Sequence, residues 1–440
     1  MRIVSAALSF PLAAALAAQD APKVVSMTPA NLAEVDAKTT KQMVVVFDRA
    51  MNEDGFSFCG GGPNFPKTTG RPKWKDGKTV VLEVELEPDH RYSLSLNCPA
   101  ASNFRSAEGV ALAPVPWSFS TIPGKVRAAG EQKQRNQKAL AELMRVLAES
   151  YSYRDLRVKD WKKLEKEGAP AVLAAKTDRG FAAAAANMLK PTADLHLYLK
   201  LGDDVFGTGS RAVDPLFRRD LLRRYAKVSA IGDQVIAGRT DDGIGYLMIG
   251  AWTKDVDPER VGGAITELAD TKAMVIDVRA NCGGDELLAQ QVAAWFVDGT
   301  KVYAKNRYRD RSGLDGFGAI LERSITGNGE NRRYDKPIAV LTSRYVMSSN
   351  ESFVMMLQQA KDCTVVGQPT FGSSGNPKPF DLGNGVTAIV PSWQDLRLDG
   401  TPFEGEGLKP DVLVACTAKD LETGDPILEK ALEILRGKAK

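Results

Sequence analysis

The stretch KAMVIDVRANCGGDELLAQQVAAWFV, residues 272–297, joins two hydrophobic patterns through a pair of glycines. Its first part, KAMVIDVRA, is a nearly continuous apolar run, which predicts a strand covered on both faces. Its second part, DELLAQQVAAWFV, predicts a helix. A buried strand followed at once by a helix is typical of an α/β layer.

The same alternation continues from about residue 230 to the end of the chain. Asp257-Pro258 and Asp425-Pro426 mark two helix starts, because both pairs put a capping carboxylate before a proline in the first turn. We expect an α/β domain over 191–440 and a helical lead-in over 123–190. The strands are predicted in GIGYLMIGAW, KPIAVLTS and CTVVGQ, and the helices in DPERVGGAITELAD, NESFVMMLQQAK and DPILEKALEILRGK.

The first third of the chain predicts an all-β unit over 19–122. Short alternating or β-branched runs are separated by turn signals, which is typical of a small β-sandwich. Its opening, VVSMTPANLAEVDAKTTKQMVVVFDRAM, resembles that of bacterial Ig-like domains. We interpret His90 in this part as a surface residue without a catalytic role. Cys59 and Cys98 can pair in an oxidising compartment, and the sequence leaves this open.

Composition excludes several functions. The 440 residues carry a net charge of +3, which gives no argument for nucleic-acid binding. Only two histidines are present, and the motifs of common metal and cofactor sites are missing, so we expect none. The start, MRIVSAALSFPLAAALAAQDAP, predicts a signal peptide over 1–18 and export to the periplasm or the exterior; the alternative is an uncleaved apolar N-terminal helix. No other run is apolar and long enough for a stable membrane span.

Two loops after predicted strands carry candidate chemistry. In DVRANCGGDE, residues 277–286, Gly283 and Gly284 leave backbone N–H groups free, which suits an oxyanion hole; the alternative is a plain strand-to-helix turn. In VMSSNESF, Ser348 or Ser349 begins a helix, where a hydroxyl can serve as a nucleophile. The alternative is an ordinary N-cap, with Glu351 as the capping-box partner of Ser348.

A serine nucleophile needs a base, usually His or Lys. His196, in TADLHLYLKLG, lies in an apolar context where a single histidine is more often structural than catalytic. The other histidine, His90, belongs to the β unit. A Ser–His pair in this chain would therefore use His196.

Four segments, in order, resemble the tail-specific, or carboxyl-terminal-processing, serine peptidases. The resemblance covers about residues 130–440, and four motifs in the right order are far more specific than one. The segments are YSYRDLRVKDW with ADLHLYL, then DVRANCGG, then SSNESFVMMLQQAKDCTVVGQPTFGSSGNP, then EGEGLKPDVLV.

This resemblance implies a crotonase/ClpP-like α/β core and a serine endopeptidase or carboxyl-terminal processing activity. By position it makes Ser348 the nucleophile, and the backbone N–H of Ser349 joins Gly283 or Gly284 in the oxyanion hole. The remaining polar residues of the glycine loop are expected to fix its shape rather than do chemistry. They are Asp277, Arg279 and Asn281.

The sequence departs from the bacterial processing enzymes at their lysine base, because Ser373 stands where they have Lys. The tricorn-like branch uses a histidine with a nearby glutamate, which His196 and Glu404 match; Glu406 is the alternative acid. The branch's D-G-H-[ST] motif is altered here to Asp-Leu-His-Leu.

Fewer than 50 residues separate His196 from the GIGYLMI strand, so a PDZ domain does not fit between them. The segment DPLFRRDLLRRYAKV, residues 214–228, predicts a basic helix with a solvated face. The alternative for this segment is that it helps to hold an acidic peptide or a free carboxylate.

We expect a secreted serine peptidase that acts on proteins or peptides through an acyl-enzyme, without a cofactor. ClpP-like cores often assemble, so a homo-oligomer is left open. Two alternatives remain: a catalytically worn protein of the same fold that binds peptide or lipid, and a hydrolase of non-peptide esters, which fold alone does not exclude.

Overall fold

The computed structural model describes residues 21–438 except 125, 212, 311 and 314. The signal peptide predicted over 1–18 lies outside these residues. The chain forms two compact units: the first extends to Gln132 and includes Ala175–Ala183, and the second contains Lys133–Ala174 and the chain from Ala184 onward. The helical lead-in expected over 123–190 is thus divided between the two units.

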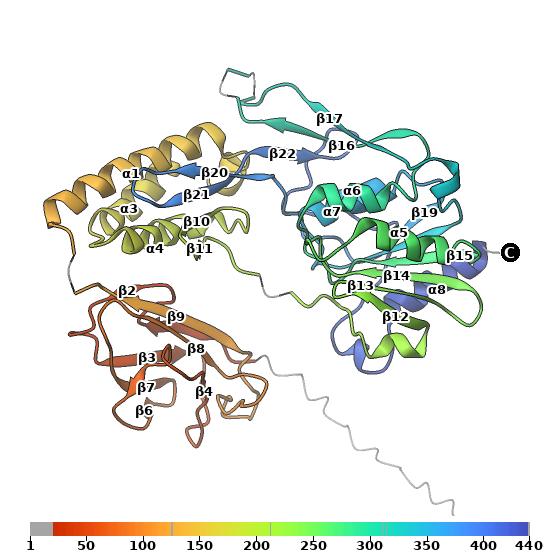
Figure 1. Ribbon diagram of the computed structural model, residues 1–440. Coiled ribbons are helices and arrows are strands. Elements are labelled where there is room, and N and C mark those ends of the chain that lie inside the picture. Colours follow the sequence, from red (N-terminus) through yellow and green to blue (C-terminus); the bar gives the residue numbers. More distant parts are fainter. Residues whose placement is uncertain (1–20, 125, 212, 311, 314, 439–440) are drawn as a thin grey trace, which may run out of the picture. The chain divides into compact units, whose positions relative to one another are not determined.

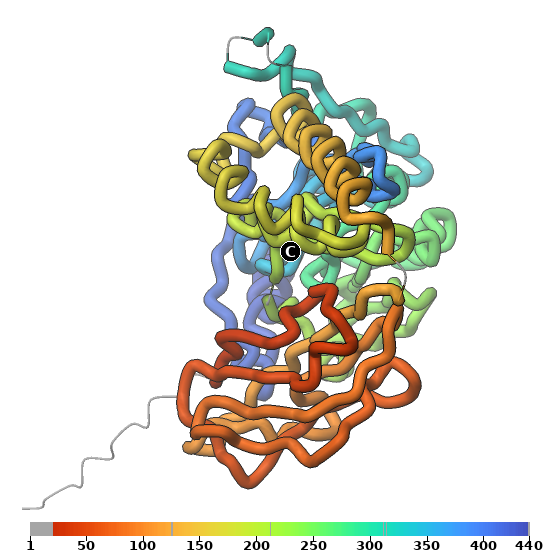
Figure 2. The backbone as a smooth tube through the Cα atoms, turned by 90° about the vertical axis from the view of Figure 1, so that its left-hand side faces the viewer, coloured from red at the N-terminus to blue at the C-terminus, as the bar shows by residue number. Residues whose placement is uncertain are grey.

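The first unit contains two β-sheets, drawn in red and orange in Figure 2. One sheet has the order β1-β3-β7-β5, with β6 paired to β7, and the other the order β2-β9-β8-β4. Buried and less buried residues alternate along β7, so one face packs on the core. The strands are β1 (Val24–Thr28), β2 (Glu34–Val35), β3 (Gln42–Phe47), β4 (Phe58–Cys59), β5 (Lys67–Thr68), β6 (Lys73–Asp76), β7 (Thr79–Glu85), β8 (Arg91–Leu96) and β9 (Val115–Thr121).

Polar contacts attach the Ala175–Ala183 segment to these strands. Arg179 Nε donates to Ser120 Oγ at 2.6 Å, and the Thr177 hydroxyl donates to Glu34. Cys59 and Cys98 are free thiols in this structure, so the pairing that the sequence leaves open is not formed here.

The second unit is built on a seven-stranded sheet of order β12-β13-β14-β15-β18-β19-β23. The first three strands are antiparallel, and those from β14 to β23 are parallel. The α/β alternation expected from the sequence is confirmed here. The strands are β12 (Lys227–Gly232), β13 (Val235–Arg239), β14 (Ile244–Ile249), β15 (Ala273–Asp277), β18 (Ile338–Thr342), β19 (Cys363–Gly367) and β23 (Val412–Leu413).

Helices cover both faces of this sheet, which explains why its strands are apolar throughout. Ile276 and Val340 pack in the core with α5 (Pro258–Glu267), α6 (Glu286–Ala293) and α7 (Ser349–Leu357). Their neighbours Val275 and Leu341 pack in a second core with α8 (Pro426–Lys438). Figure 1 shows α5, α6 and α7 on one side of the sheet.

Smaller elements surround this layer. Two further sheets have the orders β11-β10-β21-β20 and β17-β16-β22. No helix among the described residues is both long and apolar enough to cross a bilayer. The remaining elements are α1 (Ala129–Ser150), α2 (Arg154–Arg157), α3 (Trp161–Leu173), α4 (Asp178–Leu189), η1 (Lys190–Thr192), β10 (Tyr198–Leu201), β11 (Asp204–Gly207), η2 (Leu221–Arg224), β16 (Thr300–Tyr308), β17 (Leu321–Thr326), η3 (Glu330–Arg332), β20 (Pro377–Asp381), β21 (Thr387–Pro391), β22 (Trp393–Leu396) and η4 (Asp420–Glu422).

The basic helix predicted over 214–228 is wrong. Only η2, a single 3₁₀ turn, forms in this segment. Leu221 and Leu222 of that turn are buried in the second core, the one that contains α8. From Lys227 onward the chain pairs with β13. Tertiary packing and sheet pairing therefore override the local helical preference.

Candidate active site

Most of the predicted site residues, but not His196 and Glu404, lie at the carboxyl ends of three parallel strands. The loops that follow β15, β18 and β19 span 278–285, 343–348 and 368–376. In a parallel sheet these ends lie along one edge, where α/β proteins bind their ligands. The sheet thus brings together the glycine loop (278–285), the loop that ends at Ser348 (343–348, here called the serine corner) and the loop that contains Thr370-Phe371-Gly372 (368–376).

Ser348 is the N-cap residue of α7 and has an unusual backbone. Its φ of 58° is rare for a residue with a side chain. The Ser348 N–H donates to Glu351 Oε2 at 3.1 Å and to the carbonyl of Ser373 at 2.8 Å. Strained backbone of this kind is concentrated at functional sites, and here the surrounding contacts hold it in place.

The Ser348 hydroxyl faces a histidine. Ser348 Oγ lies 3.1 Å from His196 Nε2, and Ser373 Oγ lies 2.9 Å from His196 Nδ1. The backbone N–H of His196 donates to Asp194 Oδ1 at 2.9 Å, and this hydrogen bond holds the loop that carries the histidine. The imidazole therefore contacts one hydroxyl at each nitrogen, which is the geometry of a base between a nucleophile and an orienting group.

The surroundings favour a neutral imidazole. Burial lowers the pKa of His196 below its ordinary value. The carboxylate of Asp194 opposes this change, and the positive charges of Arg157 and Arg211 reinforce it. A neutral ring can accept the proton of a serine hydroxyl, so the shift suits a general base.

The resemblance implied that Glu404 lies next to the histidine, but the contacts of its carboxylate are with other residues. Its carboxylate accepts the Ser374 N–H at 2.9 Å and forms an ion pair with Arg157. Burial raises the pKa of Glu404, and the nearby Asp194 adds to the rise. Glu406, the alternative acid, is exposed. The group that meets His196 Nδ1 is thus the hydroxyl of Ser373, whereas Glu404 supports the next residue along.

The glycine loop has a conformation that side chains rarely adopt. The φ values of Gly283 and Gly284 are 106° and 137°, and a Cβ on Gly284 would lie 2.0 Å from the carbonyl oxygen of Trp252. The Gly283 N–H donates to Asn281 Oδ1 at 2.8 Å. This contact occupies the Gly283 N–H, so of the two predicted oxyanion donors Gly284 is the one that this contact leaves available. The Ser349 hydroxyl donates to the carbonyl of Gly284 at 2.7 Å and fixes its orientation.

A buried ion cluster supports the start of this loop. Arg279 has no exposed side-chain surface and forms paired contacts of 2.7–3.0 Å with both Asp277 and Asp425. Tyr246 donates its hydroxyl to Asp277 Oδ2 at 2.8 Å. These residues are satisfied inside the protein, which agrees with the expectation that Asp277 and Arg279 fix the loop.

Glu351 has a larger role than the sequence suggested. The sequence pattern identifies it as a capping partner, yet its fully buried carboxylate also accepts the N–H groups of Gly372 and Ser373 and the hydroxyl of Thr370. It therefore ties the serine corner to the segment that orients His196. Burial raises the pKa of Glu351 to about 7.

The helical lead-in supplies further supports that local patterns did not reveal. Tyr151 donates to Asp194 Oδ2 at 2.6 Å, next to the histidine loop. The hydroxyl of Tyr153 lies 2.8 Å from Ser374 Oγ. The only sequence signal for these roles was the YSYRDLR segment itself, which matched the family lead-in without indicating any contact.

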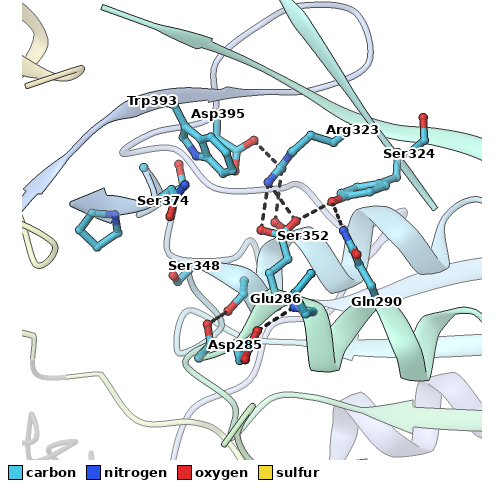
Figure 3. A pocket seen from close by; sticks show the side chains of 17 residues that line it. Asp285, Glu286, Gln290, Arg323, Ser324, Ser348, Ser352, Ser374, Trp393 and Asp395 are labelled. Atoms are coloured by element: carbon cyan, nitrogen blue, oxygen red, sulfur yellow. Dashed lines mark hydrogen bonds and ion pairs between the residues drawn. The ribbon is translucent and has the colours of Figure 1, made fainter. Parts of the chain in front are cut away.

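A pocket of about 520 Å³ opens beside Ser348 (Figure 3). Its wall includes Ser348, Ser349 and Gly284, so the pocket borders the predicted site. Nothing in the local sequence patterns indicated its far wall, since that wall combines residues of α6, β16, β17 and β22.

Sequence comparison identifies the family of the segment that carries Ser348 and the glycine loop. Residues 243–414 match the sequence model of peptidase family S41. The chain carries a peptidase family S41 domain. The resemblance to the carboxyl-terminal-processing peptidase family is thereby confirmed for residues 243–414.

Two curated relatives of this domain are carboxyl-terminal-processing proteases. The protein from Synechocystis is 26% identical over 230 residues, which span 49% of this chain and 49% of the relative. CtpA of Bacillus subtilis is 24% identical over 183 residues, 41% of this chain and 37% of the relative. This chain thus matches half or less of the length of these relatives.

Solved structures share the fold of the S41 domain and its surroundings. A putative peptidase from Parabacteroides merdae superposes with a TM-score of 0.60 at 23% identity, over 68% of this chain and 96% of that one. Mature CPAF gives a TM-score of 0.52 at 13% identity, over 70% of this chain and 97% of that one. These neighbours have the mixed α/β architecture expected from the sequence.

Proposed function

We propose that this protein is an exported serine peptidase that cleaves peptide bonds of proteins or peptides. The observation that carries the proposal is the contact between Ser348 Oγ and His196 Nε2, at 3.1 Å, within the second unit, which carries the S41 domain. The curated relatives are processing proteases, which supports a peptide rather than an ester or a lipid as the substrate.

In the proposed mechanism His196 takes the proton of Ser348 as its oxygen attacks the peptide carbonyl. The N–H groups of Gly284 and Ser349 stabilise the oxyanion, at about 3 kcal/mol per donor. The hydroxyl of Ser373 holds Nδ1 of the ring and steadies the imidazolium that forms. His196 then returns the proton to the leaving amine, and a water molecule hydrolyses the acyl-enzyme.

Glu404 takes part in this proposal as a positioning residue. It holds Ser374 through the backbone, and Ser374 adjoins the Ser373 that orients the base. The arrangement corresponds to a histidine-base branch of the family, as the sequence suggested, with a serine at the position of the lysine.

Finer features belong to the same proposal. The parallel sheet covered by helices supports a crotonase/ClpP-like core, and the two facing sheets of the first unit support an Ig-like sandwich. The proposed export rests on the N-terminal segment, residues 1–18, which we interpret as a signal peptide.

Covalent labelling tests the proposal directly. A fluorophosphonate probe reacts with a serine only when a base activates it, so we expect the mature protein to be labelled at Ser348. Peptide mass spectrometry locates the adduct. Ser348→Ala is the control, because it removes the proposed nucleophile and should abolish the label. A folded protein that stays unlabelled, or carries the label on Ser349, would contradict the proposal.

The pH dependence provides a second test. A histidine base acts when neutral, and burial lowers the pKa of His196 from its ordinary 6.5. We therefore expect the acidic limb of kcat/KM to fall below pH 6.5, with activity retained as the pH rises through that value. The measurement uses a peptide without groups that titrate in this range. A limb above pH 6.5 would show that the ring is more easily protonated than its burial implies.

A further inference from the structure

The pocket beside Ser348 has an unequal charge balance. Three carboxylates line it, from Asp285, Glu286 and Asp395, against the single guanidinium of Arg323. The other residues of its wall are uncharged. With all four groups ionised, the lining carries one positive and three negative charges, a net charge of −2.

Arg323 reaches from β17 across the pocket and is enclosed by acidic partners (Figure 3). Its side chain is 10% exposed. One terminal nitrogen contacts both oxygens of Glu286, at 3.0 and 3.1 Å, and the other donates to Asp395 Oδ1 at 2.7 Å. The guanidinium is thus already shared between two carboxylates and offers little attraction to a further anion.

The carboxylates differ in their access to the pocket. Asp395 is buried, which raises its pKa to about 6, and its carboxyl group is already held by Arg323. Glu286 retains more exposed surface, at 24% of its side chain, and Asp285 is exposed at the N-terminus of α6. Glu286 and Asp285 therefore present the negative charge that a ligand in the pocket would meet.

Two further observations indicate the rest of the ligand. The Arg323 guanidinium carbon lies 4.9 Å from the centre of the Trp393 ring, and this ring lines the pocket, so an aliphatic stem can pack beside it. Among the described residues, the buried Arg323 Nε and Trp393 Nε1 have no hydrogen-bond partner. Because both nitrogens have almost no accessible surface, a ligand in the pocket meets the flat faces of these groups rather than these donors.

We propose that this pocket binds a lysine or arginine side chain of the substrate, next to the peptide bond that Ser348 attacks. The inference rests on the proposed peptidase function and adds its substrate class. The cationic head meets Glu286 and Asp285, and the stem lies along Trp393. An acidic side chain is disfavoured, because the pocket is net negative and its one cation is already paired.

Peptides that differ in one residue test this preference. Two fluorogenic sets carry Lys, norleucine or Glu on either side of the scissile bond. In one set we expect kcat/KM for Lys to exceed that for norleucine by about tenfold, and Glu to be the poorest. The preference for Lys should weaken at high salt, since the carboxylates are partly exposed.

Two variants locate the cause. Glu286→Gln and Asp285→Asn each remove one negative charge, and asparagine still caps α6. Each should reduce the Lys-to-norleucine ratio of kcat/KM severalfold. Glu322→Gln is the matched control: Glu322 neighbours Arg323 on β17, is exposed and does not line the pocket, so its ratio should equal that of the wild type.

A binding measurement separates this inference from the catalytic proposal. Ser348→Ala cannot form an acyl-enzyme but keeps the pocket, so calorimetry on it should show tighter binding of the Lys peptide than of the norleucine peptide. Equal binding, or active enzyme that does not prefer Lys in either set, would overturn the pocket assignment. Failure of fluorophosphonate labelling would instead overturn the catalytic proposal.

Discussion

Replacing His196 with alanine should reduce kcat/KM toward a fluorogenic peptide by about 10⁴-fold or more. His196 Nε2 lies 3.1 Å from Ser348 Oγ, so the variant leaves the proposed nucleophile without the group proposed to take its proton. Because the residues of a catalytic set act as a unit, adding Ser348→Ala to His196→Ala should cost little more than either change alone.

The chain offers a matched control for this substitution. His90→Ala removes the only other histidine, whose Nε2 lies 2.9 Å from the carbonyl oxygen of Pro63 in the first unit. This variant should keep wild-type activity. Far-UV circular dichroism would verify that both proteins are folded. Retained turnover in His196→Ala would mean that another group serves as the base.

Replacing Arg279 with methionine should greatly reduce the free energy of unfolding. The change leaves Asp277 and Asp425 as unpaired charges at a site without solvent access. Removing one partner of a buried ion cluster typically costs about 3–5 kcal/mol of the free energy of unfolding. Urea unfolding, followed by tryptophan fluorescence, measures this change.

Arg239→Met is the control for the Arg279 variant. Arg239 also pairs with a carboxylate, Asp270, at 3.0 Å, but its side chain is 42% exposed and that of Asp270 71%. Surface pairs of this kind contribute little, so the unfolding midpoint should hardly move. If the two variants unfold alike, the buried cluster would not be the support of the glycine loop that its contacts suggest.

Local patterns were sufficient to predict the elements of the sheet that carries the site. The runs KAMVIDVRA and KPIAVLTS became β15 and β18 because each is apolar on both sides, and both faces of the sheet are covered by helices. Ser348 and His196 could also be selected, the first by family position and the second because the alternative histidine lies among β strands. Hydrophobic periodicity and composition are properties of neighbouring residues, so they can be obtained without the fold.

The side-chain contacts within the site could be obtained only from the fold. His196 and Ser373 are 177 positions apart, and Arg157 and Glu404 are 247 apart, so no local spacing relates them. The sequence therefore assigned Glu404 to the histidine, whereas the packed chain brings the Ser373 hydroxyl to Nδ1 and gives Glu404 to Arg157 and Ser374. Hydrogen bonds act over about 3 Å, so the partner of each polar group is decided by packing between distant segments rather than by their order in the chain.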